Sequence, residues 1–308
     1  MGEDTSFAEA IRLTPAQEIV TPTAVQQSVA RIAEWVAQSL RVRVAEGDKR
    51  GTSSPRQSRL LLVGPPGTDF GGFVATLCRT LDYPLVTLRC ERLPIYRDDM
   101  GAVLTASLEM ARREEPSVLH MSAVHIVSKV GAHAEGFMND LLRSMETEPS
   151  NVVVVATTHR PDLMDEQTLL AFDRTIVVGR PGADERETFL KTALGHLVDI
   201  DIEPLVDLTE GWSFEDIRHL AGVVLTEAKE DVAPPVSKIE QMIDEGLFVP
   251  VGTSGSKREL RQRLDRERSE LRVVERIYPD DLMDQLYLAA VTEDFAMTQS
   301  VVETLNAG

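Results

Sequence analysis

The chain reads Gly64-Pro65-Pro66-Gly67-Thr68-Asp69-Phe70 directly after an apolar run over residues 59–63. Such a glycine-rich turn after a buried strand is typical of a phosphate-binding loop, G-x-x-x-x-G-K-[ST], whose backbone N–H groups surround phosphates. Gly64 matches the first glycine of this pattern, whereas Asp69 takes the place of the second glycine and Phe70 the place of the lysine. The stretch therefore predicts a strand–loop–helix unit of the phosphate-binding type with altered chemistry.

Several changes in this loop predict weak phosphate binding. Phe70 supplies no cation for the β- and γ-phosphates, Gly71 supplies no hydroxyl for Mg²⁺, and the nearest lysines in the sequence are Lys49 and Lys129. Repulsion between the Asp69 carboxylate and a triphosphate would cost roughly 1 kcal/mol if solvent screens it, and several times more if both are desolvated. We also expect the Phe70 side chain to fill space that the phosphates need. No cofactor is therefore expected, and any binding of ATP or ADP is expected to be weak.

Further landmarks extend the pattern over most of the chain. Apolar strand-like runs alternate with helical runs from residue 59 to about residue 178, which predicts a parallel sheet with helices on both faces. Together with the loop, the landmarks resemble, in order and in spacing, the ATPase module of the AAA family, in the branch that holds proteasomal, segregase and membrane-protease ATPases. They comprise residues 59–68, 84–88, 110–121, 137–146, 152–162, 211–217 and 291–295. The resemblance implies an α/β fold with a P-loop NTPase-type parallel sheet, followed by an α-helical AAA lid.

The resemblance and the loop-forming residues divide the chain into three parts. We expect a flexible N-terminal segment over 1–22, an AAA α/β core over 23–180 and a helical lid over 181–308. Within the core, the spacing of apolar residues predicts an amphipathic helix over 23–44. Within the lid, an inserted charged helical segment around 232–288 does not follow the family pattern.

The resemblance also locates the positions that catalysis would require. In the family the Walker B strand ends in Asp-Glu, which hold Mg²⁺ and polarise the attacking water; here these positions are Ser122 and Ala123. His159 stands at the sensor-1 position. Segment 169–174 replaces the stretch that carries the arginine fingers and contains neither finger, since Arg174 follows the Phe-Asp pair and is expected to serve the next strand. We therefore expect a pseudo-ATPase without catalytic residues.

The sequence leaves three classes of function open. The first, which is our hypothesis, is a non-catalytic AAA-type subunit that acts as scaffold or regulator in an assembly with an active AAA ATPase or with its own copies. The second is a nucleotide-binding protein with slow or no hydrolysis, in which Thr68 and the loop amides still hold a phosphate. The third is a stand-alone protein-interaction module without nucleotide.

Two further stretches are candidates for protein contact. The resemblance places Tyr96 at the aromatic position of the family's pore loop, which grips unfolded polypeptide, although a tyrosine packed at the start of a helix fits the sequence equally well. Arg261, Arg268 and Arg272 lie in a charged run, 257–276, with leucines at near-heptad spacing. This run is either a solvated helix with ion pairs along its surface or a docking surface for an acidic partner.

The charge balance bears on partners and environment. The formal net charge is −18, and the 32 basic residues are mostly arginine. This balance argues against general nucleic-acid binding, which needs cations that neutralise phosphates. An acidic, lysine-poor surface suits a salt-rich cytoplasm, where screening relieves self-repulsion, so halophily is a hypothesis.

The remaining signals are consistent with a cytoplasmic protein. There is no apolar run long enough for a membrane span. Cys78 and Cys90 lack the spacing of a metal site and are expected to be buried thiols of a reduced compartment. His120 and His125 alternate along a strand-like run with no third ligand placed nearby, so we expect no metal and assign them to the core or the sheet edge.

Overall fold

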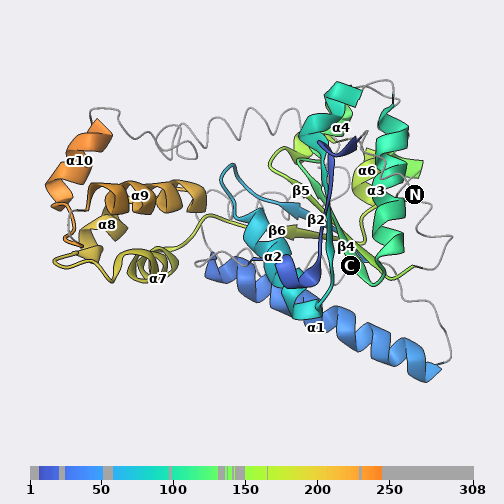
Figure 1. The fold of residues 1–308 in the computed structure, drawn as a ribbon, viewed down its shortest axis with the longest axis horizontal. Helices are drawn as coiled ribbons and strands as arrows, with labels where there is room; N and C mark the ends of the chain where they lie inside the picture. The colour runs from blue at the N-terminus through green and yellow to red at the C-terminus, as the bar shows by residue number, and fades with distance from the viewer. Residues whose placement is uncertain are drawn as a thin grey trace.

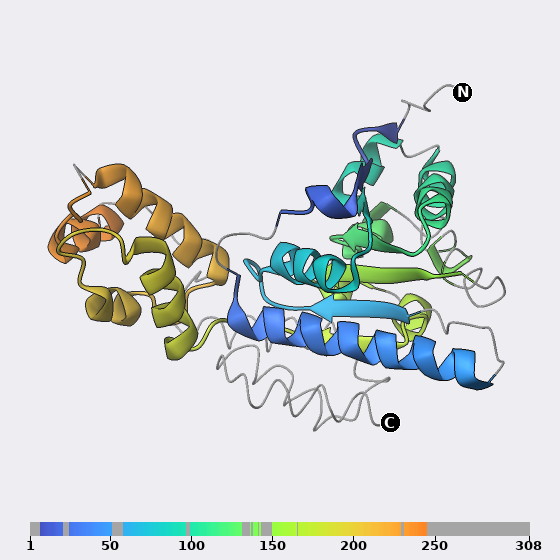
Figure 2. The same cartoon turned by 60° about the horizontal axis from the view of Figure 1, so that its bottom comes forward.

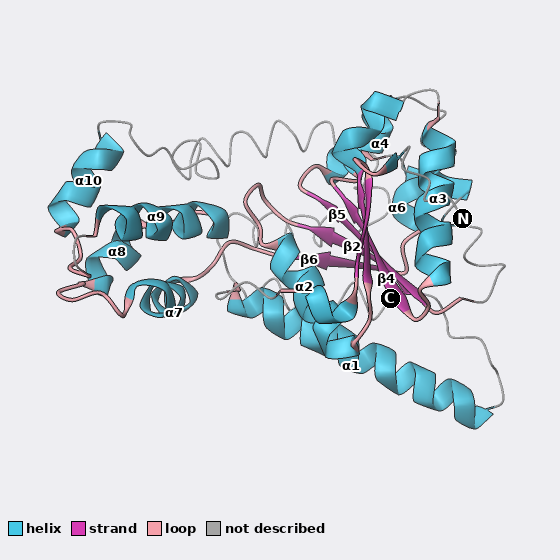
Figure 3. Ribbon diagram, in the orientation of Figure 1, coloured by secondary structure: helices cyan, strands magenta, loops and turns pink. Residues whose placement is uncertain are grey.

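The computed structural model describes residues 7–20, 25–50, 58–96, 99–130, 136, 138–140, 142, 150–164, 166–228 and 231–244. These residues form an α/β body built on one sheet and a group of helices set beside it (Figures 1 and 3). The buried apolar side chains fall into two clusters in the same way, one between Ala10 and Val178 and the other between Phe189 and Ile239. The expected boundary at residue 180 lies between the clusters. The extent of the lid to residue 308 stays a prediction, because residues 245–308 lie outside the described part.

The sheet of the described residues has six strands in the order β1-β3-β4-β5-β2-β6. Only β1 is antiparallel to its neighbour, and the other strand pairs are parallel. The strands are β1 (Ile11–Thr14), β2 (Ser58–Val63), β3 (Leu85–Arg89), β4 (Ser117–Ser122), β5 (Val152–Thr158) and β6 (Arg174–Val177). The strand β2 lies between β5 and β6, whereas β3, which follows it in sequence, lies beyond β5 and β4. The strand order therefore reverses around β2, which is where ligands bind in open parallel sheets.

Apolar composition explains why these segments form the middle of a sheet. Every residue of β5 is buried, and Leu60, Leu61 and Leu62 of β2 are at most 1% exposed. Strands that are covered on both faces read as continuous apolar runs rather than as alternating ones. The predicted α/β class with a mostly parallel sheet is confirmed.

The helices of the body lie on both sides of this sheet. On one side, α1 (Gln27–Arg50) and α2 (Phe70–Leu81) lie next to each other, and α1 runs along the body with its N-terminal end toward the separate helical group (Figure 2). On the other side, α3 (Met100–Arg113) packs against β3 and β4 (Figure 1). Two shorter helices, α4 (His125–Val130) and α6 (Glu166–Leu170), follow β4 and precede β6. No helix of the described residues is long and apolar enough to cross a membrane.

Two sequence-based boundaries in the N-terminal region are wrong. Residues 11–14, which fall in the segment expected to be flexible, form β1 and pair with β3, and Ala10 and Ile11 belong to the main core. The backbone of β3 thereby gains a hydrogen-bonded neighbour on its open edge. The helix expected over 23–44 begins at Gln27 and continues to Arg50, because the polar residues after 44 prolong it instead of forming a loop.

Within residues 183–228 and 231–244, the separate helical group has four short helices around an apolar cluster. They are α7 (Ala183–Leu194), α8 (Ile202–Leu208), α9 (Phe214–Glu227) and α10 (Val236–Asp244). Phe189 and Phe214 contact each other edge to face at its centre, with ring centroids 4.8 Å apart. The start of α9 is fixed by a capping box, in which Ser213 accepts a hydrogen bond from the Asp216 amide and the Asp216 side chain accepts one from the Ser213 amide. This group is the helical lid that follows the sheet in the predicted fold.

A largely buried ion pair joins β2 to the entry of β6. The Arg59 guanidinium contacts the Asp173 carboxylate at 2.8 Å, and the Arg59 amide donates to the same carboxylate at 2.9 Å. The Arg59 side chain is 10% exposed and that of Asp173 34%. Asp173 belongs to segment 169–174, which replaces the arginine-finger stretch, and its ion pair with Arg59 binds this segment to β2. As expected, Arg174 serves the next strand: it begins β6, and its guanidinium lies over the Trp35 ring.

Replacing Asp173 by alanine should destabilise the protein by about 2 kcal/mol, because the Arg59 guanidinium would then be largely buried without its carboxylate partner. The matched control is Glu109→Ala, which removes the partner of Arg113 in a pair whose side chains are 57% and 79% exposed. The control should change stability by less than about 0.5 kcal/mol. Urea unfolding at constant salt measures both values, and equal effects of the two substitutions would contradict this account.

Candidate functional site

The loop between β2 and α2 is a tight turn that depends on its glycines. Gly67 has a φ of +84°, a conformation that favours glycine. At Gly64 a Cβ atom would lie 2.8 Å from the Val178 carbonyl oxygen, so only glycine allows this close approach to the end of β6. The Gly64 amide donates to the Thr158 carbonyl at 3.2 Å, which ties the loop to the end of β5.

Three amides of the loop and the first turn of α2, however, are bonded to the chain itself. In a phosphate-binding loop, successive backbone N–H groups point at the anion. Here the Thr68 amide donates to the Pro65 carbonyl at 3.1 Å, the Phe70 amide to the Thr68 carbonyl at 2.9 Å, and the Gly72 amide to Asp69 Oδ1 at 3.0 Å. The Thr68 hydroxyl also donates to the Pro65 carbonyl, at 2.7 Å. These donors already have acceptors before any ligand binds.

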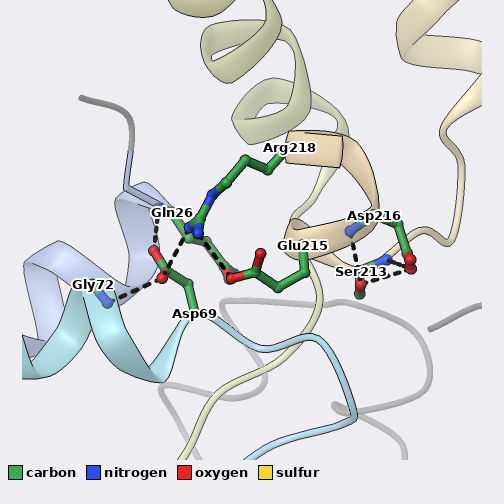
Figure 4. Close-up of polar contacts among 7 residues, drawn as sticks. All are labelled: Gln26, Asp69, Gly72, Ser213, Glu215, Asp216 and Arg218. Atoms are coloured by element: carbon green, nitrogen blue, oxygen red, sulfur yellow. Dashed lines mark hydrogen bonds and ion pairs between the residues drawn. The ribbon is translucent and has the colours of Figure 1, made fainter. Parts of the chain in front are cut away.

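Asp69 is the N-cap of α2, and its carboxylate is 2% exposed. Besides the Gly72 amide it accepts from the Gln26 amide at 3.4 Å and from Arg218 Nη2 at 3.1 Å (Figure 4). Asp is among the preferred N-cap residues, and the partial positive charge at a helix N-terminus favours a carboxylate there. The residue before α1, the first turn of α2 and α9 thus all supply donors to this carboxylate. Its expected repulsion of a bound triphosphate stays a prediction.

Arg218 reaches this carboxylate from the second turn of α9. Its Nη1 atom donates to Glu215 Oε1 at 2.9 Å, and its guanidinium lies 5.0 Å from the centre of the Phe214 ring. Glu215 is near Asp69 and Asp216 as well. Partial burial, with the two negative neighbours adding to it, raises the pKa of Glu215 even though Arg218 acts in the opposite direction.

The start of α9 lies directly on the loop. The Glu215 amide donates to the Gly67 carbonyl at 3.2 Å, and a Cβ atom at Gly67 would lie 2.1 Å from the Ser213 hydroxyl oxygen. The lid and the loop therefore touch through backbone as well as through side chains.

Phe70 is the first residue of α2, and its partly buried ring packs against the main core. Its expected effect on bound phosphates stays a prediction.

The positions compared with Walker B lie where β4 ends, and neither carries a carboxylate. The Ser122 hydroxyl donates to Glu91 Oε2 at 2.8 Å, and Ala123 has a φ of +47° in the turn that follows. The buried His125 ring contacts the His159 ring at a centroid distance of 4.5 Å, and its Nδ1 lies 3.0 Å from the Thr158 hydroxyl. Within the described residues, no group of three or more His, Cys, Asp or Glu side chains is placed to hold a metal ion. Positions 122 and 123 are thus uncharged where the family pattern has two acids, and the carboxylate beside them is that of Glu91.

The pore-loop candidate Tyr96 ends the 3-10 helix Cys90–Tyr96. Its half-buried ring meets Phe7 edge to face, with centroids 5.6 Å apart. The structure thus gives Tyr96 a packing role, while a contact with polypeptide stays a prediction. The docking candidates Arg261, Arg268 and Arg272 lie outside the described residues.

Sequence reasoning missed Gln26, Arg218 and Glu215 as parts of this site. A local signal existed for Asp69, since Asp directly before a helix fits an N-cap, and for the start of α9, since Ser213 and Asp216 have capping-box spacing. The pairing of Asp69 with Arg218 joins residues far apart in sequence and has no local signature.

A glycine turn that ends a central strand at the point of strand reversal, followed by a helix and later by a helical lid, defines the class of P-loop NTPase-type folds. Residues 60–180 match the model of the AAA family, the ATPase family associated with various cellular activities. The chain therefore contains a module of the AAA family.

The relatives it resembles are longer proteins. The chain is 27% identical over 190 residues to an ATP-dependent zinc metalloprotease FtsH of Marinobacter nauticus, a match that covers 56% of this chain and 30% of that protein. It is 32% identical over 184 residues to spastin of Anopheles gambiae, covering 53% of this chain and 21% of spastin. The chain thus matches less than a third of the length of either relative.

Solved structures show the same fold. The AAA domain of FIGL-1 in complex with ADP has a TM-score of 0.63 at 19% identity, covering 87% of this chain and 98% of that domain. A katanin structure that concerns self-assembly has a TM-score of 0.59 at 16% identity, covering 83% of this chain and 95% of the other. At these identities the likeness supports the fold alone.

Lowering the pH should destabilise the protein through His120, which lies on β4 beside the site. Burial lowers the pKa of His120 to about 4, and its Nε2 lies 3.3 Å from the Thr157 hydroxyl oxygen. The unfolded chain, with an ordinary His pKa of about 6.5, binds the proton more readily. The stability that the neutral ring contributes is therefore complete above pH 6.5 and is lost as the pH falls toward 4.

Compared with His120→Gln, the wild-type protein should lose about 2 kcal/mol more stability between pH 7 and pH 5. Urea unfolding of both proteins at the two pH values tests this. Parallel loss in the two proteins would show that the His120 ring titrates alike in the folded and unfolded states.

Proposed function

We propose that this chain is a non-catalytic AAA-type subunit that acts as scaffold or regulator in an oligomeric assembly, with an active AAA ATPase as its partner. The observation that carries the proposal is the state of the loop: the Thr68, Phe70 and Gly72 amides are bonded to the chain's own oxygens. A nucleotide would have to break these bonds and would find no lysine at position 70 in return.

The residues at the end of β4 and in segment 169–174, which stand where the family has its catalytic groups, support the same conclusion. Phosphoryl transfer in P-loop enzymes depends on positioned charges, namely the loop lysine, a metal-bound carboxylate and an arginine. Ser122 and Ala123 hold no metal, and Asp173 of the segment compared with the finger stretch is bound to Arg59. Loss of several parts that act together removes nearly all of the acceleration, so no one part is expected to restore it.

The preserved shape supports a role in assembly. The body and lid superpose on AAA domains over most of their length, and the katanin relative of this fold is described in a structure of its self-assembly. A subunit with this shape and without the charged parts could occupy a place in a ring, where it would space, orient or silence the active subunits. The charged run that contains Arg261, Arg268 and Arg272 remains the candidate for recruiting them.

The purified chain should hydrolyse no ATP above background, and Mg-ATP should bind with a dissociation constant above about 10 μM, which corresponds to about −7 kcal/mol. A steady-state phosphate assay and isothermal titration, both at the salt concentration that keeps the protein folded, measure these values. Phe70→Lys serves as the matched variant and should stay inactive. A turnover of about 0.1 per second that an Asp69/Phe70 double variant lacks would contradict the proposal.

Reversing the charge at Arg261, Arg268 and Arg272 should abolish co-purification with an AAA ATPase from native lysate, because an acidic partner would be repelled. The melting temperature should change by only a few degrees if the run serves contact rather than folding. Reversal of Arg12, Arg31 and Arg113, which lie in the body, is the control for overall charge. Unchanged co-purification would remove the run as a contact, and a strictly monomeric protein without an AAA partner would remove the assembly.

A further inference from the structure

We propose that the Asp69 carboxylate acts as a built-in anion that latches the lid to the body through Arg218, so that the lid keeps one position without nucleotide. This inference deepens the proposed function and rests on it, because it explains how a subunit without nucleotide holds a defined shape. The juxtaposition that carries it is a carboxylate at a helix N-terminus, bound from the opposite side by an arginine of the lid (Figure 4).

The first element of the latch is the place of the carboxylate. A helix N-terminus that follows a glycine-rich loop is a site where anions bind, since its first amides lack partners within the helix. In this chain Asp69 Oδ1 accepts from the Gly72 amide and Oδ2 from the Gln26 amide. The anion at this position is therefore covalently part of the protein and cannot dissociate.

The second element is the cation. Arg218 Nη2 contacts Asp69 Oδ1 at 3.1 Å, and the two side chains are 36% and 2% exposed. Its other terminal nitrogen is held by Glu215, and the Phe214 ring lies beneath the guanidinium. These contacts come from α9 itself, so they aim the arginine at the body. Arg218 belongs to the lid and Asp69 to the body, so their ion pair joins the lid to the body.

A second contact between the lid and the body fits the same description. The Ser28 amide donates to Glu185 Oε1 at 2.5 Å, and the Ser28 hydroxyl donates to Glu185 Oε2 at 3.2 Å. Glu185 belongs to α7, while Ser28 lies in the first turn of α1. The N-termini of α1 and α2 thus each receive a carboxylate, one from the lid and one from the loop, and both carboxylates join the lid to the body. Gln26 links the two contacts, because its side chain donates to Ser28 Oγ at 2.9 Å and its backbone amide donates to Asp69.

The chemistry distinguishes this arrangement from a nucleotide-dependent one. A lid arginine that binds a phosphate would gain and lose its partner as the nucleotide binds and leaves, and the lid would move with it. Here the partner, Asp69, is always present. We therefore expect the lid to keep its contact with the body whether or not nucleotide is added. Because Asp69 also caps α2, replacing it by asparagine keeps a good N-cap while it removes the charge and the oxygen that accepts from the Gln26 amide.

Fluorescence energy transfer between the lid and the body tests the latch in the full chain. Dyes are attached at Thr226→Cys on α9 and Thr105→Cys on α3, both at exposed positions. Burial raises the pKa of both native thiols, that of Cys78 to about 12, so they should not react at neutral pH. The variants are Asp69→Asn, Arg218→Gln and the double variant. Arg113→Gln, which removes an arginine from the exposed pair with Glu109, is the matched control.

We expect a single narrow transfer distribution in the wild-type protein that saturating Mg-ATP does not shift. Asp69→Asn and Arg218→Gln should each broaden it and lower its mean. The melting temperature of Asp69→Asn should stay close to the wild-type value, because no charge is left buried, whereas that of Arg218→Gln should fall, because the buried Asp69 carboxylate loses its cation. The double variant should match either single variant, because one contact is lost in each case. Arg113→Gln should leave the distribution unchanged.

A wild-type distribution in both Asp69→Asn and Arg218→Gln would overturn the latch, and so would additive effects in the double variant. These outcomes do not decide the proposed function, which is tested by ATP hydrolysis and Mg-ATP binding of the wild-type protein. If the wild-type protein hydrolysed ATP while Asp69→Asn still freed the lid, the proposed function would fail and the latch would stand. If the wild-type protein bound no nucleotide and the variants kept its transfer distribution, the latch would fail and the proposed function would stand.

Discussion

A single carboxylate, that of Asp69, organises the region where the first helices, the loop and the lid meet. It ends the loop by capping α2, accepts the backbone of Gln26 before α1, and carries the ion pair to Arg218 of α9. An ionised carboxylate that is 2% exposed needs such partners, since a buried charge without them would be strongly unfavourable. The conformations of the loop, of the starts of α1 and α2, and of the start of α9 therefore depend on each other.

This constraint changes how the loop relates to phosphate. The sequence suggests that Asp69 opposes nucleotide by plain repulsion, whereas the structure indicates competition for the same donors. The helix N-terminus that would receive an anion already has one, and amides of the loop itself are bonded to Pro65 and Thr68. The surrounding fold of an AAA module is retained because it rests on the buried strands and on the lid cluster, neither of which needs a ligand.

The sequence predicted those features that have a local cause. The apolar runs of β2 and β5 and the glycines of the loop place the sheet and the turn, and the resemblance over 211–217 places the start of the lid helix α9. It failed for β1, because four residues of mixed polarity become a strand only when β3 offers its edge. It failed for the Asp69–Arg218 contact for a related reason, because the partner of Asp69 is supplied by a helix that is distant in the sequence. The end of α1 was missed because its polar residues after 44 continue a helix that begins on the body.

Amide hydrogen exchange at the loop tests most directly whether its donors are already satisfied by the chain. The measurement follows the Thr68, Phe70 and Gly72 amides by NMR in the protein alone and with saturating Mg-ATP. The amide of the exposed residue Gly71, in the first turn of α2, serves as internal reference. The account predicts that the three amides are protected relative to Gly71 in the protein alone and that Mg-ATP leaves their exchange rates unchanged. Rapid exchange of all three in the protein alone, with protection that appears only when Mg-ATP is added, would contradict it.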